Sequence, residues 1–298
     1  MPFPNIDPVL VHIGPIAIRW YALAYIASIL LGWRYMVGML QDRRLWLNRP
    51  PPMSAERMDD LILWLTAGII LGGRLGHVLF YTPELIWKNP IEILRVWNGG
   101  MSFHGGALGV LVAGWLFARR NGVDPLRLGD LVVVAEPIGG FFVRIANFIN
   151  GELWGRPTQV PWGMVFCNRQ IITSYGFCPA GSVPRHPSPL YEAALEGLLM
   201  LAVLWWATHG PKKLFNRRGV VMGIFLTGYA VIRMSLENVR QPDAGLDHLP
   251  YGLTMGMMLS APMLLAGVVL IWRGLREPLP PAMAEPSAAE SAVSHEPA

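Results

Sequence analysis

Residues 141 to 157 read FFVRIANFINGELWGRP, an apolar run that Arg144, Asn147 and Asn150 interrupt. A helix whose whole surface faced lipid would exclude an arginine and two amides, because charge at membrane depth is costly. Such residues face a cavity or a partner, so they mark a functional site by default. The segment therefore predicts a membrane helix with one polar face.

The composition of the whole chain indicates a membrane protein. Of its 298 residues, 53% are hydrophobic and only 15% are charged, which is outside the usual range for soluble domains. Seven stretches are long enough, at about 20 residues each, to cross a bilayer core of about 30 Å. The expected fold is an all-α polytopic membrane protein with about seven transmembrane helices, near residues 17–38, 60–81, 101–118, 130–149, 189–208, 219–239 and 252–273.

Basic residues between the predicted helices set the expected orientation. The positive-inside rule makes the side that carries most of them cytoplasmic. An odd number of helices then places the N-terminus in the periplasm and the C-terminus in the cytoplasm. No cleaved signal peptide is expected, because residues 1–15 lack a basic segment and a small-residue cleavage site. The basic residues on the cytoplasmic side are Arg43, Arg44, Arg49, Arg57, Arg119, Arg120, Arg127, Lys212, Lys213, Arg217, Arg218, Arg273 and Arg276.

The net charge of +4 comes largely from these connections. It therefore reflects topology and anionic membrane lipid rather than nucleic acid. No nucleic-acid partner is expected.

Two segments lie outside the predicted helices. Residues of about 150–188 are rich in Gly, Pro and aromatic side chains, and we expect a small ordered periplasmic head there, between the fourth and fifth helices. It contains Cys167 and Cys178, which either form a disulfide in an oxidising compartment or remain two partly buried thiols. Residues 277–298 are rich in Pro, Ala and Glu, so we expect a disordered cytoplasmic tail after one transmembrane domain of residues 1–276.

Polar residues gather at one depth of the predicted bundle. Once each helix has a direction, the depth of every polar residue in the membrane follows from its position in the helix, at about 1.5 Å per residue. Each residue alone has a simpler explanation, because Arg74 could extend to lipid headgroups and Arg233 could pair with Glu237 one turn on. Their convergence favours a shared site instead. The residues near the outer ends are Tyr21, Arg74, His77, His104, Arg144, Asn147, Asn150, Tyr229, Arg233 and Glu237.

The residue types at this depth point to a phospholipid. The planar, permanently charged guanidinium suits phosphate, so Arg144 and Arg233 near headgroup depth predict a lipid phosphodiester as ligand. Asn147 and Asn150 can hydrogen-bond to glycerol hydroxyls or ester carbonyls.

A reaction at such a site needs a proton acceptor if the nucleophile is a neutral thiol or hydroxyl. His104 is the expected base, because histidine exchanges protons near physiological pH. Glu237 either orients Arg233 or is the alternative base. The seven histidines lack metal-ligand spacing, so no metal is expected.

Five blocks of the sequence resemble a known family. They are GGRLGHVLFY, RVWNGGMSFHGGALG, RIANFINGELWGRP, RHPSPLYEAALEG and YAVIRMSLENVRQPDA. In this order they are similar to the prolipoprotein diacylglyceryl transferases of bacterial inner membranes. The RIANFINGELWG block fits that family's signature, although Ala146 stands where many members carry glycine. The resemblance covers nearly the whole chain except the tail.

The resemblance implies the first step of bacterial lipoprotein maturation. The enzyme would move the diacylglyceryl group of phosphatidylglycerol onto the lipobox cysteine thiol of a preprolipoprotein, leaving a thioether and glycerol 1-phosphate. The signal peptide would approach laterally through the membrane lipids, and no soluble cofactor is required. By resemblance, Arg144 and Arg233 contact the headgroup, and the further positions that the family needs are Tyr21, His104, Asn147, Asn150, Glu152, Gly155, Tyr229, Glu237 and Arg240.

A transporter or flippase for an anionic amphiphile is the main alternative. Its polar residues should continue into the inner half of the bundle, where Glu136 and Glu196 are among the few we find. A structural or chaperone-like membrane protein is a weaker alternative, since it has no need of two arginines and a histidine at one depth.

Overall fold

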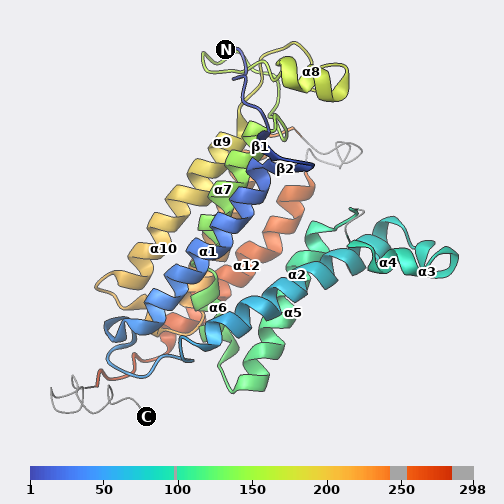
Figure 1. The fold of residues 1–298 in the computed structure, drawn as a ribbon. Helices are drawn as coiled ribbons and strands as arrows, with labels where there is room; N and C mark the ends of the chain where they lie inside the picture. The colour runs from blue at the N-terminus through green and yellow to red at the C-terminus, as the bar shows by residue number, and fades with distance from the viewer. Residues whose placement is uncertain (97–98, 242–253, 284–298) are drawn as a thin grey trace. The chain divides into compact units, whose positions relative to one another are not determined.

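A computed structural model describes residues 1–96, 99–241 and 254–283, and it is mostly helical (Figure 1). Contacts between residues divide the chain into two units. The first comprises residues 1–36 and 132–280, and the second comprises residues 37–131 and the C-terminal residues from 281. The predicted disorder of the tail falls mostly on residues 284–298, which lie outside the described residues.

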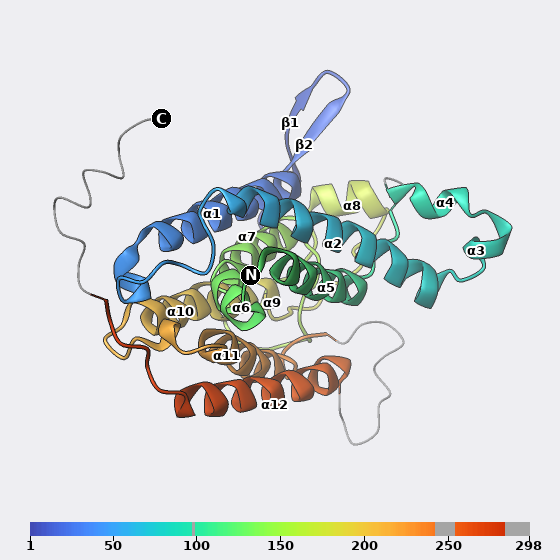
Figure 2. The same ribbon diagram turned by 90° about the horizontal axis from the view of Figure 1, so that it is seen from below.

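The first unit contains a two-stranded sheet and most of the long helices. Helices α7 and η3 pack against each other, and α11 packs along α12, as Figure 2 also shows. Its elements are β1 (Val9–Ile13), β2 (Ile16–Arg19), α1 (Trp20–Gln41, whose last residues belong to the second unit), α7 (Glu136–Ile149), α8 (Arg169–Tyr175), α9 (Ser188–Glu192), the π-helix η3 (Ala193–Leu199), α10 (Met200–His209), η4 (Leu214–Asn216), α11 (Val220–Leu236) and α12 (Met255–Arg276).

The second unit is built on one pair of closely packed helices, α2 (Arg57–Tyr81) and α5 (Phe103–Asn121). Glycines line their contact: a Cβ on Gly72 would collide with the backbone of Gly105 and Gly109. Small residues let helix backbones approach closely where lipid removes the hydrophobic driving force. The other elements are η1 (Arg43–Trp46), α3 (Leu85–Lys88), α4 (Ile91–Leu94) and α6 (Pro125–Val132).

Five helical segments are long and apolar enough to cross a membrane, judged by length and composition over the described residues. They are Trp20–Gln41, Arg57–Tyr81, Pro125–Ile149, Ser188–His209 and Met255–Arg276. The predicted helices near 101–118 and 219–239 are present as α5 and α11, but neither is among the five. Helix α11, Val220–Leu236, is apolar but shorter than the five. The chain therefore has the make-up of a polytopic membrane protein, and the count of seven crossings stays a prediction.

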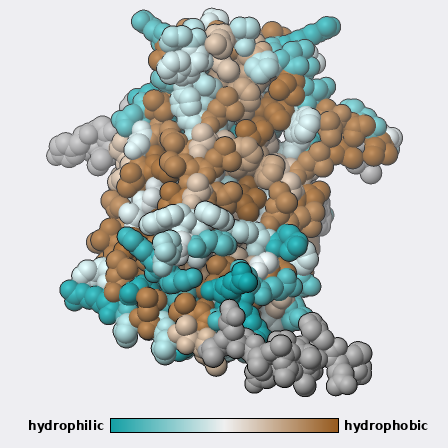
Figure 3. Space-filling model, turned by 90° about the vertical axis from the view of Figure 1, so that its left-hand side faces the viewer, coloured by the Kyte–Doolittle hydropathy of each residue, from teal (hydrophilic) through white to brown (hydrophobic). Residues whose placement is uncertain are grey.

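The surface of these helices agrees with a lipid environment. In the most apolar window of α12, only 11% of the residues are buried. Its exposed side chains include Leu265 and Trp272. On the face seen in Figure 3, hydrophobic residues gather between hydrophilic ones toward the two ends.

The all-α prediction is wrong at the N-terminus, where β1 and β2 form an antiparallel hairpin. Residues 17–19, predicted as helix, belong to β2, and Val11 pairs with Ile18. The turn uses Gly14, whose φ of 58° is left-handed, followed by Pro15. Such a Gly-Pro turn between runs of β-branched residues favours a hairpin. The hairpin projects from the start of α1 in Figure 2.

Residues 150–187, which we call the head, form an ordered segment joined to the N-terminus. Phe166 and Phe3 are almost fully buried and stack at 4.9 Å between ring centroids, with Ile171 and Ala180 completing the core. The Phe3 amide donates to the Val165 carbonyl at 3.2 Å. The head therefore has local structure of its own, and its place on the periplasmic side stays a prediction.

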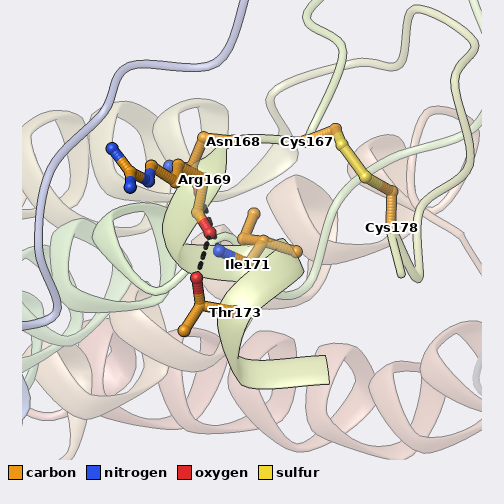
Figure 4. Close-up of a disulfide and its surroundings, with 6 residues drawn as sticks. All are labelled: Cys167, Asn168, Arg169, Ile171, Thr173 and Cys178. Atoms are coloured by element: carbon orange, nitrogen blue, oxygen red, sulfur yellow. Dashed lines mark hydrogen bonds between the residues drawn. A yellow bond between two sulfur atoms is a disulfide. The ribbon is translucent and has the colours of Figure 1, made fainter. Parts of the chain in front are cut away.

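Cys167 and Cys178 form a disulfide in the head, with their Cα atoms 5.4 Å apart (Figure 4). Helix α8 starts directly after the first cysteine, because the side chain of Asn168 accepts a hydrogen bond from the Ile171 amide at 2.9 Å. Of the two possibilities that the sequence left open, the structure has the disulfide.

Candidate functional site

A carboxylate that sequence reasoning missed, Glu192, lies at the centre of the polar cluster in the first unit. Its side chain is fully buried and reaches three arginines. Oε2 lies 2.8 Å from Arg144 Nη1, and Oε1 lies 3.2 Å from Arg240 Nη1 and 3.7 Å from Arg233 Nη1. A buried charge is stable only when it is paired, so this arrangement fixes all four side chains.

Arg144, from α7, also contacts a second carboxylate. Its Nη2 donates to Glu196 Oε2 at 3.1 Å, so one guanidinium spans two glutamates. Glu192 and Glu196 are four residues apart and share a helix face. The second of them lies in η3, and π-helical turns are frequent at functional sites.

Arg233 and Glu237 pair across one turn near the end of α11, at 2.9 Å between Nη2 and Oε1. The sequence analysis gave this pairing as one explanation of Arg233, and the structure contains it. Glu237 is buried against the start of α12, where a Cβ on Gly256 would collide with its carboxylate. Among the described residues, Arg233 Nη1 is buried and has no hydrogen-bond partner apart from its ion pair with Glu192.

Arg240 ties the cluster to the head. Its guanidinium reaches Glu192, while its carbonyl accepts a hydrogen bond from Arg156 Nε at 2.9 Å. Its backbone forms an antiparallel bridge with Gly155. Gly155 has no room for a side chain, because a Cβ would collide with the Val239 carbonyl.

A second polar cluster joins α1 and the end of α7. The Asn147 amide donates to Tyr21 OH at 2.8 Å and to Glu152 Oε1 at 2.9 Å. The Asn150 amide donates to the same oxygen at 3.4 Å. Both asparagines predicted from the sequence therefore converge on Glu152, a residue that only the family resemblance had indicated.

Two predicted residues have other surroundings. Tyr229 is half-buried on α11, one turn before Arg233, with its ring beside that of Phe225. His104 lies in the first turn of α5 in the second unit, and its side chain is exposed. The membership of His104 in the site stays a prediction.

Three guanidinium groups face three carboxylates: Arg144, Arg233 and Arg240 with Glu192, Glu196 and Glu237. Each guanidinium has five N–H donors, and these ion pairs use only some of them. Their carboxylate partners hold these guanidinium groups in place, which is the kind of fixed arrangement that pre-organised electrostatic sites use.

His186 lies at the end of the head, two residues before α9 begins at Ser188. Its carbonyl accepts from the Gly155 amide at 2.9 Å, and its Nδ1 lies 3.2 Å from Tyr191 OH. Partial burial lowers the pKa of His186, which favours the neutral ring.

Glu192 and Glu196 are the site residues without an assigned role in the sequence analysis. Glu196 was counted only as an inner polar residue, and Glu192 was not considered. The available signal was two glutamates, one turn apart, inside an apolar helix of about 20 residues.

Comparison with known proteins gives one consistent family. A family model described as "Prolipoprotein diacylglyceryl transferase" matches residues 8–273. A protein of Phenylobacterium zucineum (strain HLK1) is 68% identical, covering 95% of this chain and 98% of that protein, and one of Caulobacter sp. (strain K31) is 54% identical over 100% of both. One of Rhizobium meliloti (strain 1021) is 49% identical over 92% and 94%.

All three relatives are named phosphatidylglycerol–prolipoprotein diacylglyceryl transferase. The match runs through every segment that contributes to the polar clusters. The chain belongs to the prolipoprotein diacylglyceryl transferase family.

Proposed function

We propose that this chain transfers the diacylglyceryl group of phosphatidylglycerol to the cysteine thiol of a prolipoprotein. The sulfur forms a C–S bond to the glyceryl carbon, the C–O bond to phosphate breaks, and glycerol 1-phosphate leaves with the electron pair. The observation that carries this proposal is the buried set of arginines around Glu192, among helices with apolar surfaces.

Arg144, Arg233 and Arg240 bind the phosphate in this proposal. Their carboxylate partners hold the guanidinium planes in place, so donors are aimed before the lipid arrives. Arg233 Nη1, which is buried and has no hydrogen-bond partner in the part of the chain that the structure describes, has donor capacity for a phosphate oxygen. As the C–O bond breaks, charge grows on the phosphate, and fixed donors stabilise the transition state more than the ground state.

The second cluster holds the neutral part of the headgroup. Asn147 and Asn150 each have amide groups that can exchange hydrogen bonds with glycerol hydroxyls. Glu152 Oε1 fixes both amides, and Tyr21 OH completes the wall. Gly155 and Tyr229 shape the site in this proposal, Gly155 by letting the head approach closely.

His104 accepts the thiol proton in this proposal, because a thiolate is the nucleophilic form of cysteine. Glu237 serves chiefly to orient Arg233, with which it pairs.

The topology is part of the proposal. Seven helices cross the bacterial inner membrane, with the N-terminus and the head in the periplasm and the C-terminus in the cytoplasm. Residues 1–276 act as one transmembrane catalytic domain, and 277–298 are a cytoplasmic tail. The disulfide supports a periplasmic location of the head, because disulfides persist in oxidising compartments. The signal peptide reaches the site laterally from the bilayer.

The test uses purified protein in proteoliposomes that contain phosphatidylglycerol and a lipobox peptide. The expected products are glycerol phosphate and a peptide heavier by one diacylglyceryl group. A peptide with serine for the lipobox cysteine, and vesicles of phosphatidylcholine alone, are the controls. If neither product forms but labelled lipid crosses the bilayer, the transferase proposal fails and the transporter alternative is supported.

A further inference from the structure

Arg74, on α2 of the second unit, has a buried guanidinium bound by backbone oxygens. Only 7% of the residue is exposed. Nη1 donates to the carbonyls of Gly99 at 2.7 Å and Gly100 at 3.0 Å, Nε donates to that of Ile93 at 2.9 Å, and Nη2 donates to that of Glu92. The sequence-based alternative that Arg74 extends to lipid headgroups is therefore wrong.

The four carbonyls belong to the connection between α2 and α5. Gly99 and Gly100 both have left-handed backbones, with φ of 84° and 74°. Side chains are strained in this region, and a Cβ on Gly100 would lie 2.6 Å from His77 Nε2 and 2.9 Å from Arg74 Nη1. Two consecutive glycines thus turn two carbonyls toward one guanidinium nitrogen.

This turn leads directly into the first turn of α5. The Ser102 amide donates to the Gly73 carbonyl at 2.8 Å, next to Arg74 on α2. The Ser102 side chain caps α5 by accepting from the Gly105 amide at 3.2 Å. His104 follows two residues after this cap. The place of His104 is therefore set by a short segment that is attached to α2 at both Arg74 and Gly73.

We propose that Arg74 is a positioning residue: it holds the Gly99–Gly100 turn and thereby the start of α5 that carries His104. This inference rests on the proposed role of His104 as the base. Arg74 acts through the backbone, without contact with the lipid. A planar guanidinium can serve four carbonyls in different directions, whereas a lysine ammonium is a point charge with three donors.

The experiment compares Arg74→Gln, Arg74→Lys, His104→Gln and the double variant Arg74→Gln/His104→Gln in the proteoliposome assay. We expect Arg74→Gln to lower kcat about 10- to 100-fold, as misplacement of a catalytic group by about 1 Å does. The KM for phosphatidylglycerol should stay within about twofold, because the phosphate-binding residues are unchanged. Arg74→Lys should recover part of kcat, and the double variant should be no slower than His104→Gln alone.

Arg95→Gln is the matched control. Arg95 belongs to the same connection, but it is exposed and pairs with Glu92 three residues away, close to the surface. Its loss should leave kcat unchanged. If Arg74→Gln does not fold, Gly100→Ala replaces it, since a Cβ there displaces the turn while Arg74 is retained. Its expected result is the same loss of kcat with an unchanged KM.

Each result decides the inference. If His104→Gln is slow but Arg74→Gln keeps the full rate, the positioning role is overturned and the base assignment stands. The same holds for Gly100→Ala where it replaces Arg74→Gln. A double variant slower than His104→Gln by the full factor of Arg74→Gln overturns it as well, because Arg74 would then act independently. A full rate in His104→Gln removes the base assignment, and the positioning role with it.

Discussion

Glu192 Oε2 lies 2.8 Å from Arg144 Nη1, and the carboxylate that makes this contact is fully buried. The same glutamate reaches Arg233 and Arg240 through its other oxygen. One anion therefore fixes three cations that come from α7, α11 and the segment after α11. The geometry of the proposed phosphate site depends on a residue that is not itself a phosphate ligand.

Replacement of Glu192 by glutamine should therefore damage both stability and activity. It leaves three guanidinium groups facing two carboxylates, and breaking a buried ion pair costs about 3–5 kcal/mol. The midpoint of thermal unfolding in detergent and the rate in proteoliposomes should both fall. Glu277→Gln is the control, because its pair with Arg218 is partly exposed to solvent, and pairs near the surface are worth about 1 kcal/mol or less. Equal effects of the two substitutions would contradict the central role of Glu192.

Arg144→Ala and Arg233→Ala should each reduce turnover at least about 100-fold, the scale for loss of one fixed donor to transition-state charge. The measurement is release of glycerol phosphate at saturating phosphatidylglycerol. Arg276→Ala, which removes an arginine stacked on Trp272 in α12, should keep the rate. Near-normal rates in both site variants would refute the assignment of these arginines to the headgroup.

Sequence reasoning found the arginines of the site because charge inside apolar helices stands out. Arg144 and Arg233 lie in the middle of apolar runs, and Glu237 follows Arg233 at helical spacing. Glu192 gave a weaker signal than the arginines, because it lies near the start of a predicted helix, where acidic residues are common. Its partners come from segments about 50 residues away on either side, a distance that periodicity does not bridge.

In the fold, too, the sequence predicted the features that depend on neighbouring residues better than those that depend on contacts between separate segments. Helix positions follow from apolar length, and each of the seven predicted stretches overlaps one or more helices, with ends that differ by a few residues. Helix α1 begins at Trp20, three residues after the predicted start, because residues 17–19 pair with β1 as part of β2. The disulfide could not be decided from two cysteines eleven residues apart, since their approach depends on how the surrounding chain packs, with Phe166, Ile171 and Ala180 in one core.

Gly155→Ala should destabilise the junction between the head and α11. The added Cβ would meet the Val239 carbonyl and lie 2.7 Å from His186 Cβ. The backbone cannot move away without loss of its 2.9 Å hydrogen bond to the His186 carbonyl. Overpacking of this kind costs about 1–3 kcal/mol, and turnover should fall because Arg240 pairs with this strand.

Gly114→Ala in α5 is the control for Gly155→Ala. A Cβ there makes only an ordinary contact of 3.7 Å with Leu65 Cδ2. Replacing a helical glycine should be neutral or stabilise by about 0.5–1 kcal/mol. A loss of stability in Gly114→Ala as large as in Gly155→Ala would show that any added methyl group is harmful, and the steric argument would fail.

The double substitution Cys167→Ser/Cys178→Ser should loosen the head. A disulfide that closes a loop of this length stabilises by about 3 kcal/mol. Limited proteolysis should cut within residues 168–177 sooner in the variant than in the parent chain. The reducing agent dithiothreitol should have the same effect on the parent chain and none on the variant. Unchanged cleavage in both cases would contradict a structural role for the disulfide.

His186 should make the stability of the head junction depend on pH. Burial lowers the pKa of His186 in the folded protein, so the unfolded chain binds the proton first as the pH falls. The folded state keeps its full stability above the ordinary histidine pKa of about 6.5 and loses some of it as the pH drops below that value. In thermal unfolding between pH 7.5 and 5, His186→Gln should therefore lose less stability than the parent chain. A steeper loss in His186→Gln would mean that the protonated ring is favoured in the folded protein, which would reverse the sign.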